Sequence, residues 1–333
     1  MKKEKTIEQK RKIQNIKMFF LRPEVALFIP IIILCIYTQS QKPNFLTWRY
    51  FSSILMASSY IGTATIGIAI ITLVGETDLS VGLSGTLAGV IAGYAVQNFG
   101  AGVFGYVLVG LVFGVCVGLL NGYLITHFKL PAWIVTMAVM YICDGFSNFI
   151  TNGVPISLKS LGVSDFFSAR PLGLNWIFII FVMLLVLTDI LIRCTKLGYQ
   201  ITAVGGNAKA ALMAGIDVNK IKIIAFVLCS VFSVIGGLFD GFNNGTVKAG
   251  IGSGRNFRAV TACAIGGMIA GEGTILGTAI GVLLFHVLWY ALRILEVDTN
   301  QQLVFIGVAL IASVLLSSIR KKIEEKNLAT MSE

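Results

Sequence analysis

Residues 103–126 read VFGYVLVGLVFGVCVGLLNGYLIT, a run of twenty-four residues without one charged side chain. A helix needs roughly 20 mainly apolar residues to cross the hydrocarbon core of a bilayer. The run therefore predicts a membrane-spanning helix. Small residues recur in it from Gly110 to Gly122, where they let neighbouring helices approach closely.

The rest of the chain has the same character. Of its 333 residues, 56% are apolar and 13% are charged, and the mean hydropathy is +0.85. Soluble domains average about 45–50% apolar and about 25% charged residues. This composition excludes an ordinary soluble domain, which would expose too much apolar surface, and intrinsic disorder, which needs low hydrophobicity. The chain belongs in a lipid bilayer.

Nine further apolar runs flank the first one. Together the ten runs predict an all-α polytopic membrane protein with about ten transmembrane helices. The run at 257–270 is short for a full crossing, so we expect it to be tilted, broken or partly re-entrant. The nine runs lie at 24–39, 51–74, 79–98, 131–150, 172–193, 221–240, 257–270, 274–294 and 301–319.

Basic residues indicate which ends face the cytoplasm. Residues 1–22 carry eight Lys or Arg, residues 193–222 carry five, and residues 320–326 carry four. The positive-inside rule then places both tails in the cytoplasm, and it explains the basic excess without a nucleic-acid partner. We expect a basic cytoplasmic tail at 1–22, a transmembrane domain at 23–319 with a cytoplasmic loop at 194–220, and a cytoplasmic tail at 320–333.

The sequence holds little that could support catalysis. No G-x-x-x-x-G-K-[ST] loop occurs, so any ATP hydrolysis must take place on another chain. The absence of an H-E-x-x-H motif disfavours an intramembrane metalloenzyme. With two histidines and six cysteines, none in a C-x-x-C pair, we expect no metal site, no cofactor and buried free thiols.

Two similar breaks interrupt the apolar runs. Gly75–Leu79 reads GETDL, and Gly271–Ile275, 196 residues later, reads GEGTI. Matched glycine interruptions are what a transporter built from two repeats would show, which predicts an internal inverted repeat. A chance match between two glycine-rich segments is the alternative.

Two aspartates stand out among the charged residues at membrane depth. Each such charge costs about 2.5–3.5 kcal/mol near a helix centre. Asp189 and Arg293 lie near predicted helix ends, and His286 is interpreted as a packed neutral imidazole. Asp78 and Asp144 instead have small polar neighbours, which suit a wet cavity better than a lipid-facing surface.

The loop at 193–222 predicts a short helix. Asn207 is a candidate N-cap, the alanine-rich run after it favours a helix, and Gly215 is a candidate stop. A helix held on a cytoplasmic loop is typical of a docking element. An ordinary connector is the alternative.

Several motifs, in order, resemble those of one family. They are DLSVG at 78–82, PAWIVT at 131–136, TNGVPI at 151–156, GGN at 205–207 followed by GIDVNKIK at 215–222, and a glycine-rich stretch at 262–281. From about residue 50 to 320 the chain resembles the membrane permease subunit of bacterial ATP-binding-cassette sugar importers, in the ribose/xylose/galactoside branch. The resemblance implies an ABC importer type II-like permease fold.

The resemblance also implies partners. It predicts two cytoplasmic ATPase subunits that carry ATP and Mg, an extracytoplasmic solute-binding protein, and a second permease copy in a homodimer or heterodimer in the bacterial inner membrane. The expected cargo is a monosaccharide or related polyol, with a nucleoside or furanosyl signal molecule as the alternative. The residues that would couple the permease to the ATPase are Gly205, Gly206, Asn207, Ala211, Gly215, Ile216 and Asp217.

The expected translocation pathway includes residues that depart from the family. Members carry Arg where Asp144 stands and an acidic residue where Arg258 stands, so we hypothesise that Asp144 pairs with Arg258 or Arg255 near the external mouth. In the alternative, these charges face an aqueous vestibule and contact the binding protein. The candidate pathway and gate residues are Asp78, Ser80, Ser84, Asp144, Asn148, Asn152, Arg255 and Arg258.

A second class of function remains open on the residues alone. An ion-coupled secondary carrier could use Asp78 or Asp144 as its proton or sodium site, and such carriers also contain repeats and broken helices. The predicted helix in the 193–222 loop discriminates between the two, because a carrier that works alone has no need of it.

Overall fold

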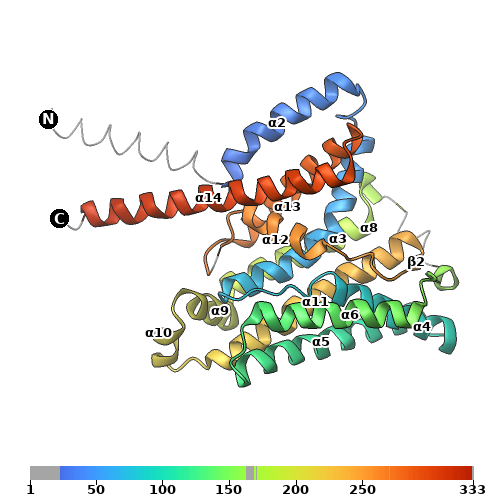
Figure 1. Ribbon diagram of the computed structural model, residues 1–333, viewed down its shortest axis with the longest axis horizontal. Helices are drawn as coiled ribbons and strands as arrows, with labels where there is room; N and C mark the ends of the chain where they lie inside the picture. Colours follow the sequence, from blue (N-terminus) through green and yellow to red (C-terminus); the bar gives the residue numbers. More distant parts are fainter. Residues whose placement is uncertain (1–22, 163–168, 170, 270, 332–333) are drawn as a thin grey trace.

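The computed structural model describes residues 23–162, 169, 171–269 and 271–331 (Figure 1). The predicted tail at 1–22 and the last two residues lie outside this part. Two short strands, β1 (Ile156–Ser157) and β2 (Thr246–Val247), accompany the helices. The helices are α2 (Pro23–Gln41), α3 (Trp48–Leu73), α4 (Leu83–Phe99), α5 (Val103–His127), α6 (Ala132–Thr151), α8 (Trp176–Cys194), α9 (Lys196–Gly206), α10 (Ala208–Met213), α11 (Val218–Asn244), α12 (Arg255–Ile265), α13 (Ile275–Ile294) and α14 (Thr299–Met331).

Every predicted apolar run contains a helix, but fewer than ten of the described helices are long enough to cross a membrane. Among the described residues, seven helices have the length and composition of a membrane span: α3, α5, α6, α8, α11, α13 and the first 21 residues of α14. The structure therefore supports an all-α polytopic protein and does not confirm ten crossings. Since α12 has only 11 residues, it rises about 16 Å, half of a hydrocarbon core of about 30 Å. The 257–270 run is a broken segment.

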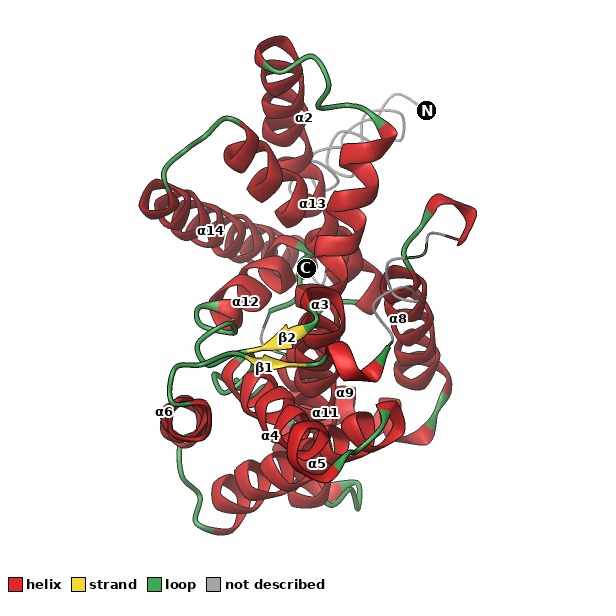
Figure 2. Ribbon diagram, turned by 90° about the vertical axis from the view of Figure 1, so that its right-hand side faces the viewer, coloured by secondary structure: helices red, strands yellow, loops and turns green. Residues whose placement is uncertain are grey.

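Helices α3 and α11 form the centre of the bundle. α11 packs against α3, α4 and α5, while α12 and α13 pack on another side of α3. Figure 2, which looks along the bundle, shows α6 at one edge and α8 at the opposite edge. α5, α8 and α14 leave many large apolar side chains exposed, as helices that face lipid do.

The two ends of the bundle differ. Figure 1 shows α9, α10 and the C-terminal end of α14 at one end and β2 at the other. β1 and β2 pair in antiparallel fashion, with Ile156 opposite Val247. This pairing ties the connection after α6 to the connection after α11. If the basic loop is cytoplasmic, β1 and β2 lie on the extracytoplasmic side.

The two matched breaks meet in space. The Gly271 amide donates a hydrogen bond of 2.8 Å to the carbonyl oxygen of Thr72, at the end of α3. An inverted repeat would place equivalent points on opposite sides of the membrane midplane. Contact between the breaks does not confirm such a repeat.

Candidate functional site

An extended segment, residues 77–82, separates α3 from α4 and runs beside α11. At its start, Glu76 forms an ion pair with Lys222 near the beginning of α11. At its end, the Gly82 amide donates to the Ser233 hydroxyl at 3.1 Å. Lys222 and Ser233 are about 16 Å apart along the helix axis. Residues 77–82 are not helical, but the carbonyl groups of Ser80 and Gly82 accept the first hydrogen bonds of α4, from the Ser84 and Thr86 amides.

Side chains from three helices satisfy the backbone of this segment. The Leu79 amide donates to the Thr136 hydroxyl of α6 at 3.0 Å. The Leu79 carbonyl accepts from the Asn256 side chain of α12 at 3.2 Å, and Ser233 of α11 accepts from Gly82. An unsatisfied backbone group at membrane depth costs several kcal/mol, so these three side chains are what make the break tolerable.

Three of the predicted pathway residues belong to this support. Asp78, Ser80 and Ser84 are fully buried. Asp78 Oδ1 accepts hydrogen bonds from the Ser80 amide at 2.8 Å and the Ser80 hydroxyl at 2.6 Å, and Asn121 of α5 donates to the same hydroxyl at 3.2 Å. The Ser84 and Ser233 hydroxyls lie 3.1 Å apart. The structure places these residues inside the protein rather than on an open surface.

The predicted pairing of Asp144 with an arginine is wrong for this structure. Arg255 pairs with Asp240 of α11, and both side chains are about nine-tenths buried. Arg258 lies over the ring of Trp289, 4.9 Å from its centroid, and in the described part of the chain neither arginine forms a salt bridge with Asp144. Asp240 offers Arg255 a carboxylate from a helix already packed in the bundle. Asp240, an acidic residue within an apolar run, was the sequence signal for this buried pair.

Asp144 and Asn148 lie on α6, and Asn152 directly follows the helix with a φ of 47°. Asp144 is half-buried, and the two asparagines are exposed. One helical turn before Asp144, the Met140 sulfur contacts the Asn256 side chain of α12 at 3.5 Å. Because residues four apart share a helix face, Asp144 lies on the side of α6 that faces α12. Tyr141 and Phe149 are also exposed nearby, at 66% and 76%.

The basic loop folds into two short helices. Thr195 caps α9, and Asn207 Oδ1 accepts from the Ala210 amide at 3.0 Å at the start of α10. The helix predicted between Asn207 and Gly215 is present as α10, and Gly215 has a φ of 81°. Gly205 and Gly206 belong instead to the end of α9. The sequence pattern predicts α10 but not α9.

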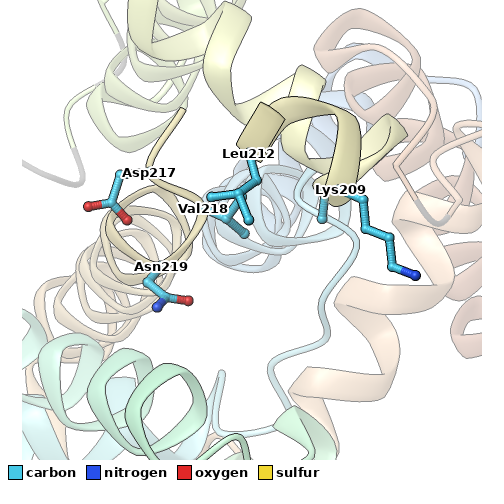
Figure 3. Close-up of a pocket in the computed structure, with 6 residues that line it drawn as sticks. Lys209, Leu212, Asp217, Val218 and Asn219 are labelled. Atoms are coloured by element: carbon cyan, nitrogen blue, oxygen red, sulfur yellow. The ribbon is translucent and has the colours of Figure 1, made fainter. Parts of the chain in front are cut away.

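The outer surface of α10 carries two large apolar side chains beside the exposed Lys209. Ala211 is buried, whereas Leu212 is 64% exposed and Met213 is 90% exposed. Asp217 caps α11 by accepting from the Lys220 amide at 3.0 Å, and Ile216 packs inward. Lys209 and Leu212 of α10 line a hollow of about 290 Å³ together with the start of α11. In Figure 3, Leu212 lies next to Val218, and the Lys209 side chain extends away from Asp217 and Asn219.

A second hollow adjoins the first. It has a volume of about 340 Å³ and is lined by charged groups that include Glu76, Lys129 and Lys222. Asn219 borders both hollows. The loop-facing end of the bundle is therefore indented beside α10, next to the place where the extended segment begins.

The cysteines are partly as predicted. All six are free thiols, and Cys143, Cys229 and Cys263 are buried. Cys116 and Cys194 are exposed, so the expectation of uniformly buried thiols is wrong for these two. Each lies on a helix whose outer surface is apolar, where a thiol is a small apolar group.

Comparison with known proteins finds a family and relatives that are all described as permeases. Residues 50–314 match a family described as branched-chain amino acid transport system / permease component. The chain is 29% identical over 300 residues to the ribose import permease protein RbsC of Escherichia coli (strain K12), covering 87% of this chain and 92% of that protein. No solved structure matches.

Two further relatives carry the names of other sugars. The chain is 31% identical over 283 residues to the L-arabinose ABC transporter permease protein AraH of Azospirillum brasilense, with 84% of this chain and 83% of that protein covered. It is 28% identical over 328 residues to the galactose/methyl galactoside import permease protein MglC of Haemophilus influenzae, with 92% and 98% covered.

Proposed function

This chain belongs to the branched-chain amino acid transport system permease family, and we propose that it is the membrane-spanning permease of an ATP-driven, binding-protein-dependent monosaccharide importer. Its relatives include ABC permeases named for ribose, arabinose and galactosides, so it is a multi-pass transport subunit of the bacterial inner membrane rather than an enzyme. The observation that carries the proposal is the exposed apolar surface of α10 on an otherwise polar loop.

We propose that α10 docks on a separate ATPase subunit. In addition to Tyr199 on α9, this loop leaves two large apolar side chains exposed, Leu212 and Met213 on α10. Large apolar groups on a polar rim are typical of a protein-binding surface. The adjoining hollow of about 290 Å³ would receive side chains of the ATPase. ATP and Mg would bind that partner and not this chain.

The face of α6 that carries Asp144 supports a sugar pathway. It combines a carboxylate, the Asn148 amide and the exposed aromatic ring of Tyr141. Carboxylate and amide groups can bond sugar hydroxyls, while aromatic faces cover their C–H surface, as in binding sites that are mainly apolar with a few placed polar groups. In our proposal two permease copies present this face to a shared path.

Alternating access would use the two breaks. Broken segments at membrane depth occur where they line cavities and where parts of a transporter move relative to one another. Closure of the ATPase pair would shift α10 and switch the permease between two global states. An extracytoplasmic binding protein would deliver the sugar at the end of the bundle that carries β1 and β2.

Reconstitution tests the proposal. The chain is purified with its co-eluting ATPase and placed in vesicles with its binding protein. Uptake of labelled ribose, L-arabinose, methyl galactoside and a nucleoside is then measured with ATP supplied on the ATPase side. We expect ATP-dependent uptake of one sugar and no uptake with a non-hydrolysable analogue. Uptake driven by a proton or sodium gradient without ATP would instead identify an ion-coupled carrier. Uptake of a nucleoside alone would replace the sugar as the substrate.

A further inference from the structure

Three glycines from distant parts of the sequence meet beside α10. Gly75 follows α3, Gly205 lies at the end of α9, and Gly271 lies in the turn between α12 and α13. A methyl group on Gly205 would stand 1.7 Å from the carbonyl oxygen of Leu73 and 3.3 Å from the Gly271 Cα. A methyl on Gly271 would stand 2.6 Å from the Gly205 oxygen. The Gly205 backbone is therefore in direct contact with the end of α3 and with Gly271, and a methyl on Gly75 would stand 3.8 Å from the Gly205 oxygen.

Hydrogen bonds hold the same place together. The carbonyl oxygen of Thr72 accepts from the Gly75 amide at 2.9 Å and from the Gly271 amide at 2.8 Å. Gly75 and Gly271 have φ values of 85° and 86°, in the left-handed region that glycine adopts readily. One carbonyl group thus joins the α3–α4 break to the α12–α13 turn.

A second link joins this place to α11. Glu76 follows Gly75 and forms its ion pair with Lys222, and both side chains are mostly buried. Lys222 lies five residues after the Asp217 cap, on the helix that directly follows α10. The loop that contains α10 is therefore attached to the α3–α4 break on both of its sides, by Gly205 before it and by Lys222 after it.

The contact at Gly205 is tight, whereas its neighbour is free of such contact. A methyl on Gly206 would meet no atom within 4 Å. α9 ends at Gly206 and α10 begins at Ala208, so only Gly206 and Asn207 separate the junction from the exposed helix. Backbone in contact with backbone has no long side chain that could rearrange to absorb a displacement.

We infer that Gly75, Gly205 and Gly271 form the junction through which a movement of α10 reaches both broken segments of the membrane domain. The inference rests on the proposed function, in which α10 follows the closing ATPase. From the junction, one path leads along residues 77–82 with Asp78. The other enters α12 at its C-terminal end, and the buried Arg255 lies at the opposite end of that helix. The glycines act as positioning residues and touch no substrate.

The Gly205→Ala variant tests the junction. In the reconstituted complex we measure ATP hydrolysis, sugar uptake and the amount of ATPase bound. The added methyl separates α9 from Leu73, so the ratio of sugar taken up to ATP hydrolysed falls by roughly tenfold, within the usual range of coupling between sites, while the ATPase stays bound. Gly307→Ala on α14 is the control. A methyl on Gly307 meets no atom within 4 Å, so we expect this variant to leave the ratio unchanged.

The Gly206→Ala variant separates the junction from the docking surface. Its methyl meets no atom of this chain within 4 Å, so any loss in this variant reports contact with the ATPase, and we expect its ratio to fall clearly less than that of Gly205→Ala. An equal loss in the Gly205 and Gly206 variants would assign the effect to contact with the ATPase and overturn the inference, as would an unchanged ratio in Gly205→Ala. If the unaltered complex fails to couple ATP to uptake, the proposed function itself fails.

A charge exchange covers the case in which Gly205→Ala does not accumulate in the membrane. Glu76→Lys and Lys222→Glu each place like charges together, and the double exchange restores an ion pair. We expect a lowered uptake-to-ATP ratio in each single variant and recovery in the double variant, with unchanged ATPase binding. A double variant as impaired as the singles would overturn the attachment of the loop to this break.

Discussion

Single hydrogen bonds decide whether the extended segment can exist at membrane depth. Thr136 accepts from the Leu79 amide, which has no helical partner. The Thr136→Val variant keeps the shape of the side chain and leaves that amide unsatisfied, so we expect it to lower the free energy of unfolding by about 1–3 kcal/mol. Thermal unfolding in detergent measures the loss as a lower midpoint.

Thr188→Val is the matched control for this change. Thr188 is also buried, but its hydroxyl donates only to the Leu184 carbonyl of its own helix, at 2.8 Å. Removing it costs about 0.5 kcal/mol, at the low end of the net worth of one hydrogen bond. Equal losses in the two variants would mean that Thr136 does not support the segment.

The buried pair of Asp240 and Arg255 gives a second prediction at this scale. Arg255→Met leaves a carboxylate uncompensated inside the bundle and is expected to cost about 3–5 kcal/mol. Changing both partners, as Asp240→Leu with Arg255→Met, removes both charges, and we expect it to recover most of the stability. Both are measured by thermal unfolding. A double variant less stable than Arg255→Met would show that the uncompensated Asp240 carboxylate does not cause the loss of stability.

The sequence predicts residue types better than residue partners. Asp78 stands two residues before Ser80, a spacing that favours a side-chain turn of its own, and the structure contains that turn. The partner of Arg255 could not be derived, because Asp240 lies on another helix and only the packing of α11 against the rest brings it there. Charge sign alone suggested Asp144 equally well.

At the scale of elements, apolar runs predict the helices closely but not where helices break. Lipid offers no partner for backbone groups, so a long apolar run is expected to be helical, and each such run contains a helix here. The run at 79–98 predicted a helix from Leu79, whereas α4 begins at Leu83. The four residues between stay outside the helix. Thr136 and Asn256 bond to the backbone of Leu79, and Ser233 bonds to that of Gly82, which is a tertiary effect.

α10 carries the prediction that belongs to this scale. Met213→Ala removes the most exposed apolar side chain of the loop. If α10 docks on the ATPase, the complex loses about 2 kcal/mol of binding free energy, the usual cost of a residue that dominates an interface, or roughly 30-fold in Kd. Co-purification across a titration of ATPase measures it.

Met183→Ala is the control for α10. Met183 is 53% exposed on α8, among the apolar side chains of a predicted span. Its removal takes away a similar group that faces away from the loop, so ATPase binding is expected to stay the same. A Met213 variant that binds like the control would place the docking surface elsewhere on the molecule.

The whole molecule has two chemically distinct ends, and its orientation follows from their charge. The end with α9, α10 and the tip of α14 (Figure 1) contains the basic stretches at 193–222 and 320–326. Positive charge near the ends of spans is retained on the cytoplasmic side. The β1 and β2 end must then face outward. Lys209 and Lys159 are exposed at the two ends and serve as reporters.

Sidedness can be measured with a membrane-impermeant maleimide. In a background with Cys194→Ser, we expect Lys159→Cys to react in intact right-side-out vesicles and Lys209→Cys to react only after the membrane is opened. The reverse pattern would place α10 outside the cell, where no ATPase could reach it, so this one result would remove both the docking surface and the junction at Gly205 from the mechanism. The orientation of the whole chain thus decides whether its elements can act as proposed, because an ATP-driven movement can enter only from the side on which ATP is present.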